Sequence, residues 1–112
     1  MDLLLVNPGN ASGIYQDLAR DLAAIEPPTW ALLLAEAVRS KGYSVGILDV
    51  NAERLNLKDS IKRIRELNPK LVCFVVYGQN VNAGTVSMSG ATLLSTLLKE
   101  EFPKITVSFI GS

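Results

Sequence analysis

Residues 71–76 read LVCFVV, six apolar residues in a row without a polar break. A strand with one face in water alternates apolar and polar residues, whereas a strand covered on both faces is apolar throughout. The run is too short for a helix, and its valines favour extended backbone. Residues 71–76 are therefore predicted to form a central strand of a parallel sheet.

Three further apolar runs of strand length accompany this one, at residues 3–6, 45–48 and 105–110. The run at 3–6 is also continuous, which predicts a second central strand. The run at 45–48 is less continuous and suits a position nearer the edge of the sheet. Four strands are expected in all.

The stretches between these strands have helical periodicity. The first begins after Pro27 and Pro28, stops at Gly42 and is predicted to bury one apolar stripe. That stripe consists of Trp30, Leu33, Leu34, Ala37 and Val38. The tryptophan is expected to pack in the core, with a position at the ligand-binding edge as the alternative.

Two more helices are predicted from the same kind of pattern. Over residues 57–67, Asn56 is expected to be the N-cap, Asp59 lies in the first turn, and Asn68-Pro69 ends the helix. The third helix has its apolar stripe at Leu94, Leu97, Leu98 and Phe102, and it is closed by Pro103.

Strands and helices thus alternate along the chain, at the spacing of right-handed crossover units. This order predicts an α/β fold, a doubly wound parallel sheet in three layers truncated to about four strands. Residues 1–112 are expected to form one domain. Because such a domain normally continues beyond its fourth strand, the chain is interpreted as the N-terminal fragment of a larger protein.

Composition narrows the functional classes. The chain has 112 residues, is 48% hydrophobic and carries a formal net charge of zero, so a nucleic-acid partner is not expected. No apolar run approaches the roughly 20 residues that a membrane span needs. The single cysteine, Cys73, lies inside an apolar run and is interpreted as a core residue in a reducing, cytoplasmic protein.

Ligands of open parallel sheets bind at the carboxyl ends of the strands, where the strand order reverses. The loops expected at this edge are residues 7–28, 49–56, 77–87 and 111–112. Asp49 ends the second strand, and its carboxylate could bind a ligand or close a turn. Residues 77–85 supply amides, hydroxyls and glycines that suit either a polar, uncharged ligand or an ordinary turn.

Several familiar chemistries are not supported by these loops. Gly9 and Gly13 do not form the G-x-G-x-x-G pattern of dinucleotide-binding folds, and the phosphate-binding G-x-x-x-x-G-K-[ST] motif is absent. The acidic residues of signalling receiver domains are also missing after the first and third strands. The chain contains no histidine, so any mechanism that needs imidazole is excluded for this chain.

The whole chain nevertheless resembles the N-terminal cobalamin-binding domain of cobalamin-dependent radical S-adenosylmethionine enzymes. The resemblance is carried by LLLVNP at residues 3–8, PPTWALLLA at 27–35, GYSVGILD at 42–49 and NPKLVCF at 68–74, and it ends at Ile110-Gly111. Their order and spacing are more specific than any single motif.

The resemblance implies a flavodoxin-like, Rossmann-like sheet that binds the corrin of cobalamin over its carboxyl edge. The implied cofactor-binding residues are Asn7, Pro8, Gly9, Asp49, Tyr77, Gly78, Gln79, Asn80 and Gly111. No histidine would ligate the cobalt. S-adenosylmethionine and a 4Fe-4S cluster would belong to a following radical barrel domain, the expected partner of this domain.

The fragment itself would bind its cofactor without catalysing a reaction. The resemblance implies that the parent protein is a methyltransferase or an anaerobic magnesium-protoporphyrin monomethyl ester cyclase. The alternative is a structural domain of the same kind of enzyme that docks its partner without any cofactor.

Overall fold

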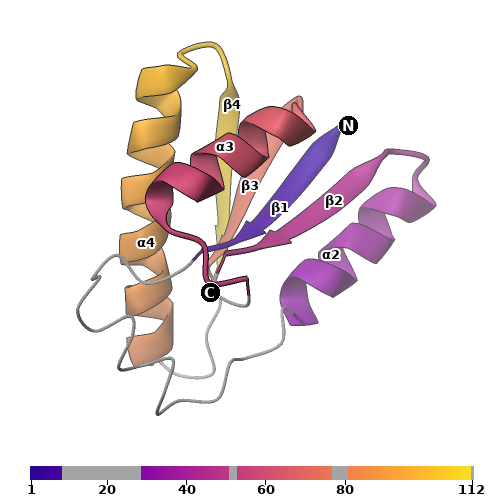
Figure 1. Ribbon diagram of the computed structural model, residues 1–112. Coiled ribbons are helices and arrows are strands. Elements are labelled where there is room, and N and C mark those ends of the chain that lie inside the picture. The colour runs from indigo at the N-terminus through magenta and orange to yellow at the C-terminus, as the bar shows by residue number, and fades with distance from the viewer. Residues whose placement is uncertain (9–28, 51–52, 77–80, 112) are drawn as a thin grey trace.

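Four parallel strands form one sheet in the order β2-β1-β3-β4 (Figure 1). They are β1 (Leu3–Asn7), β2 (Val45–Asp49), β3 (Leu71–Val76) and β4 (Thr106–Gly111). The computed structural model describes residues 1–8, 29–50, 53–76 and 81–111, with only the backbone for residues 81–89. The two continuous apolar runs are the inner strands β1 and β3, as predicted, and β2 is an edge strand.

Three helices cover the two faces of the sheet (Figure 1). They are α2 (Thr29–Ser40), α3 (Leu57–Leu67) and α4 (Val81–Glu101). The helix α2 packs on one face, whereas α3 and α4 pack together on the other. The predicted three-layer, doubly wound, flavodoxin-like α/β fold is confirmed.

The face under α3 and α4 holds most of the buried apolar side chains. Phe74 on β3 is completely buried there and stacks on Phe109 of β4, with ring centroids 5.5 Å apart. The helices contribute Ile64 from α3 and the predicted pair Leu94 and Leu98 from α4, all fully buried. These contacts make this face the main hydrophobic core of the described residues.

The face under α2 has a smaller core, and it corrects the predicted stripe of that helix. Ala31 and Ala35 are buried against Leu5 and Val75, whereas Trp30 is 52% exposed. Residues 30–35 are all apolar, so periodicity alone could not decide which stripe faces the sheet. The small alanines fit the narrow space above the strands.

The exposed stripe therefore lies on one flank of α2. Leu33 is 58% exposed and Ala37 is also exposed, at helical spacing from Trp30. The prediction that Trp30 packs in the core is therefore wrong.

The helix α3 begins and ends where the sequence predicts. The side chain of Asn56 accepts a hydrogen bond of 2.7 Å from the backbone N–H of Asp59, which satisfies one unpaired donor of the first turn. At the other end Asn68 adopts the left-handed conformation, with φ 47°, and its N–H bonds back to Ile64 and Arg65. Pro69 then prevents the helix from continuing.

The start of α4 corrects a second prediction. Residues 81–87 were expected in a loop after the third strand, but they belong to the helix, which begins at Val81. Asparagine, glycine and serine disfavour helix, glycine by about 1 kcal/mol relative to alanine, but packing of the later turns overrides such local preferences. The loop available to a ligand after β3 is therefore shorter than predicted.

Candidate functional site

The carboxyl ends of all four strands gather at one edge of the sheet (Figure 1). Asn7 at the end of β1 is opposite Asp49 at the end of β2, and Val76 of β3 is opposite Gly111 of β4. Three of the predicted cofactor-binding residues thus end strands at this edge: Asn7 and Asp49 are neighbours, whereas Gly111 lies on the far side of β3.

Asn7 and Asp49 form a side-chain pair. The amide Nδ2 of Asn7 donates a hydrogen bond of 3.0 Å to the carboxylate Oδ1 of Asp49, and the pair is partly buried. Such a charge-assisted bond fixes which way the amide of Asn7 points, because the nitrogen must face the carboxylate. The amide oxygen is thereby turned to the other side, where it can accept a hydrogen bond from a ligand.

The backbone of Asp49 has a separate role. Its carbonyl accepts a hydrogen bond of 3.0 Å from the N–H of Glu53, and the N–H of Val50 bonds to the carbonyl of Asn7 at 3.0 Å. The main chain of Asp49 thus closes the turn after β2 while its side chain pairs with Asn7. Both roles considered for Asp49 from the sequence, turn closure and ligand binding, are compatible with these contacts.

The strand order places Asn7 beside the point where the sheet reverses direction. From β1 the chain crosses to β2 through α2 on one face, whereas from β3 it crosses to β4 through α4 on the other face. The helices α2 and α4 thus lie on opposite faces, and open α/β sheets bind ligands at such a reversal of strand order. Pro8, buried directly after Asn7, ends β1 because it has no N–H to donate.

Gly111 has a structural explanation. A Cβ atom at this position would lie 2.8 Å from the carbonyl oxygen of Val76, closer than side chains tolerate. The glycine therefore permits β4 to pair with β3 up to its last residue.

The other predicted binding residues are Gly9, Tyr77, Gly78, Gln79 and Asn80. They lie outside the described residues. Their part in the site stays a prediction from the sequence, together with that of the long segment after Pro8.

Two features are absent from the described residues, a cluster of metal ligands and a membrane-spanning helix. Within residues 1–8, 29–50, 53–76 and 81–111, no three histidine, cysteine, aspartate or glutamate side chains come together as metal ligands. In the same part of the chain, no helix is long and apolar enough to cross a membrane.

Sequence reasoning missed two polar arrangements that the fold creates. It named Asn7 and Asp49 separately but did not predict their pairing. The pairing could have been predicted, because both residues end strands of the same parallel sheet. It also missed Asp2 at the opposite edge. Its carboxylate accepts from the N–H of Ser44 at 2.9 Å and lies 3.3 Å from the ammonium of Lys70.

These contacts tie together the starts of β1, β2 and β3. The backbone N–H of Ser44, then its hydroxyl, then Lys70 lower the pKa of Asp2 below its ordinary value. The candidate site and this clamp lie at opposite ends of the same strands, so a substitution at one edge can serve as a control for the other.

No protein-family model, curated protein or solved structure matches this chain.

Proposed function

We propose that this domain binds a cobalamin cofactor at the carboxyl edge of its sheet, as a non-catalytic module of a cytoplasmic radical S-adenosylmethionine enzyme. The observation that carries the proposal is the Asn7–Asp49 pair, held at 3.0 Å beside the point where the strand order reverses. The resemblance of the sequence to such domains supplies the identity of the cofactor.

The chemistry of this edge suits a corrin. Cobalamin carries amide side chains around a large ring, so its binding surface needs oriented hydrogen-bond acceptors and donors more than an anion cradle. The amide oxygen of Asn7, oriented by Asp49, would accept from such an amide, and the side-chain-free Gly111 would permit close approach. Because the chain has no histidine, the lower face of the cobalt would be empty, bound by water or met by a side chain from the edge loops.

The direct test is uptake of hydroxocobalamin by the purified chain. We expect protein that has been incubated with the cofactor and passed through gel filtration to retain the visible spectrum of the corrin. A colourless protein, with no heat of binding in calorimetry, would contradict cobalamin binding by this domain.

A matched pair of variants assigns the binding to the proposed edge. Asp49→Asn removes the charge that orients Asn7 and is expected to weaken cobalamin binding about tenfold, which is the scale of one hydrogen bond to a charged group. Asp2→Asn makes the same chemical change at the opposite edge and should leave binding unchanged. Equal losses in both variants would place the cofactor elsewhere.

A second candidate function is docking without a cofactor. It is favoured by the exposed flank of α2, where Trp30 and Leu33 leave more than half of each side chain in solvent. In that case Leu33→Gln should weaken docking to the following radical barrel domain, whereas Asp49→Asn should not. A Cys-x-x-x-Cys-x-x-Cys motif in the polypeptide after residue 112 would support the radical-enzyme context of both candidates.

A further inference from the structure

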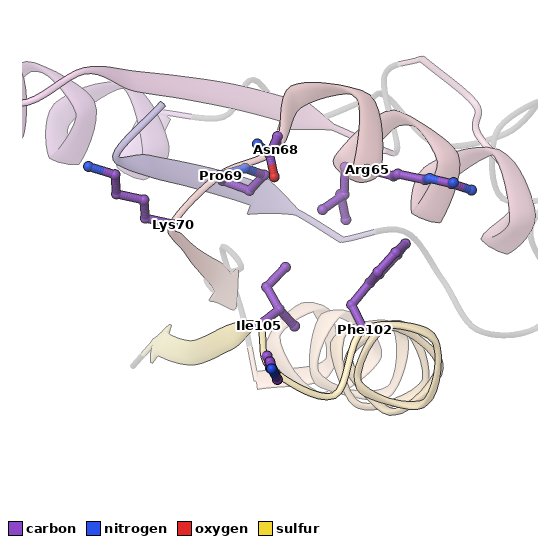
Figure 2. Close-up of a pocket in the computed structure, with 8 residues that line it drawn as sticks. Arg65, Asn68, Pro69, Lys70, Phe102 and Ile105 are labelled. Atoms are coloured by element: carbon purple, nitrogen blue, oxygen red, sulfur yellow. The ribbon is translucent and has the colours of Figure 1, made fainter.

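A pocket of about 270 Å³ lies at the edge of the sheet opposite the candidate cofactor site. It is formed where the ends of α3 and α4 meet the turns that lead into β3 and β4 (Figure 2). Its apolar wall consists of Ile64, Pro69, Phe102 and Ile105. In Figure 2 the ring of Phe102 and the side chain of Ile105 point from the α4 side toward α3.

The polar residues around this pocket are cationic. Arg65, Lys70 and Lys104 line it, and none of its lining residues is acidic. The guanidinium carbon of Arg65 lies 6.0 Å from the centre of the Phe102 ring, so this cation sits beside the apolar wall. The ammonium of Lys70 lies 3.3 Å from the carboxylate of Asp2, and in Figure 2 it points away from Phe102.

Lys70 is paired with a carboxylate, and in this Arg65 and Lys104 differ from it. Neither makes an ion pair with any residue of the described part of the chain. They come from different segments, one from the last turn of α3 and the other from the turn between α4 and β4. Two such cations beside one apolar pocket are an arrangement that an anionic ligand would complete.

Cations often gather at helix ends simply because the last carbonyls of a helix are unpaired and carry partial negative charge. At the end of α3 the N–H of Asn68 bonds to the carbonyls of Ile64 and Arg65, and at the end of α4 the N–H of Phe102 bonds to the carbonyl of Leu98. In the turn after α4, the ammonium of Lys99 donates to the carbonyls of Pro103 and Ile105 at 2.9 and 2.6 Å. Within the described residues, the side chains of Arg65 and Lys104 donate no hydrogen bond to such a carbonyl, so helix capping does not account for them.

We propose that this pocket binds a small amphiphilic carboxylate, with an aromatic or short aliphatic body. The carboxylate would pair with the guanidinium of Arg65, whose planar fork matches its two oxygens, and Lys104 would add a second positive charge. The apolar body would pack on Phe102 and Ile105. The volume lies just below the range of roughly 300–1,000 Å³ that is usual for ligand pockets, which restricts the ligand to a small molecule.

The probe for this site is 4-phenylbutyrate, with its uncharged amide, 4-phenylbutyramide, as the matched ligand control. Titration into isotopically labelled protein should give saturable shifts of the backbone amides at residues 64–70 and 102–105. The amide should bind at least about tenfold more weakly, because it cannot form the ion pair. Equal affinity of the two compounds, or shifts confined to other parts of the chain, would overturn the proposal.

Two arginines on α3 provide matched variants. Arg65→Gln is expected to weaken 4-phenylbutyrate binding about fivefold or more, and Lys104→Gln about twofold, on the scale of partly exposed charge pairs. Arg63→Gln removes the same charge two residues away, where Arg63 pairs with Glu53 at 3.1 Å, and should leave the affinity unchanged. Equal effects of the Arg63 and Arg65 substitutions would mean that the net charge of the protein attracts 4-phenylbutyrate, and would contradict a site at this pocket.

This inference does not depend on the proposed cofactor. Cobalamin uptake measures binding at the carboxyl edge of the sheet, whereas the titration with 4-phenylbutyrate measures binding at the opposite edge. Failure of either experiment therefore leaves the other proposal standing.

Discussion

The two faces of the sheet are unequal. The face under α3 and α4 buries aromatic and aliphatic side chains from the strands and from both helices, including Phe74, Leu94 and Leu98. The face under α2 buries little more than Leu5, Val75 and two alanines, and it leaves Trp30 and Leu33 substantially in solvent. The α3 and α4 face therefore holds most of the buried apolar side chains of the described residues, while α2 leaves apolar side chains in solvent.

The largest expected effect compares two neighbours on β1. Leu4 and Leu5 are both fully buried, but they point to opposite faces, Leu4 to the α3 and α4 face and Leu5 to the α2 face. Leu4→Ala should lower the free energy of unfolding by about 4 kcal/mol and Leu5→Ala by about 2.5 kcal/mol, because the thinner α2 layer can collapse into the cavity.

Chemical denaturation of both variants measures this difference. The slope of the unfolding free energy with denaturant should be the same in both, which makes the midpoints comparable. An equal or reversed order of the two variants would show that the faces contribute alike.

The next effect concerns the cap of α3 on the stable face. Asn56→Ala removes the acceptor of the 2.7 Å hydrogen bond from the N–H of Asp59 and should lower the free energy of unfolding by about 1 kcal/mol. Lys58→Ala, in the exposed first turn of the same helix, should change it by less than about 0.5 kcal/mol. Thermal or denaturant unfolding distinguishes the two, and a similar loss in both would argue against capping as the cause.

A smaller effect is expected at Asp2, and it depends on pH. The pKa of Asp2 is lowered in the folded protein by the N–H and hydroxyl of Ser44 and by Lys70, so the folded state favours the carboxylate. The contribution of Asp2 to stability is therefore fully present above the pKa of the unfolded state, about 3.9, and is lost as pH falls through the lower folded value.

Comparison of the wild type with Asp2→Asn tests this dependence. The variant should be less stable at pH 7, and the gap should close as the pH is lowered below about 4. Because the carboxylate is partly exposed, added salt should also narrow the gap at pH 7. A gap independent of pH would mean that the carboxylate charge is not responsible.

The smallest effect is expected on the exposed flank of α2. Leu33→Gln should change the free energy of unfolding by less than about 0.5 kcal/mol, because more than half of this side chain is already in solvent. Leu34→Gln is the control, since its half-buried side chain packs on the α2 core, and it should cost about 1–2 kcal/mol. If the Leu33 variant loses as much as the Leu34 variant, the flank is part of the core after all.

Local composition was enough to predict much of this architecture. The continuous runs at residues 3–6 and 71–76 indicated central strands, because only strands covered on both faces lack polar residues. The boundaries of α3 were predictable from Asn56, Asn68 and Pro69, since capping depends on short-range hydrogen bonds and backbone conformation. The edge where a ligand would bind followed from the order of the elements.

Long-range packing decided what the sequence left open. Six consecutive apolar residues made the buried stripe of α2 ambiguous, and only contact with Leu5 and Val75 selected Ala31 and Ala35 over Trp30 and Leu33. The pairing of Asn7 with Asp49, and the meeting of Arg65 with Phe102, join residues that are 42 and 37 positions apart. Such contacts arise from strand register and helix packing, which depend on the whole fold and not on any one segment.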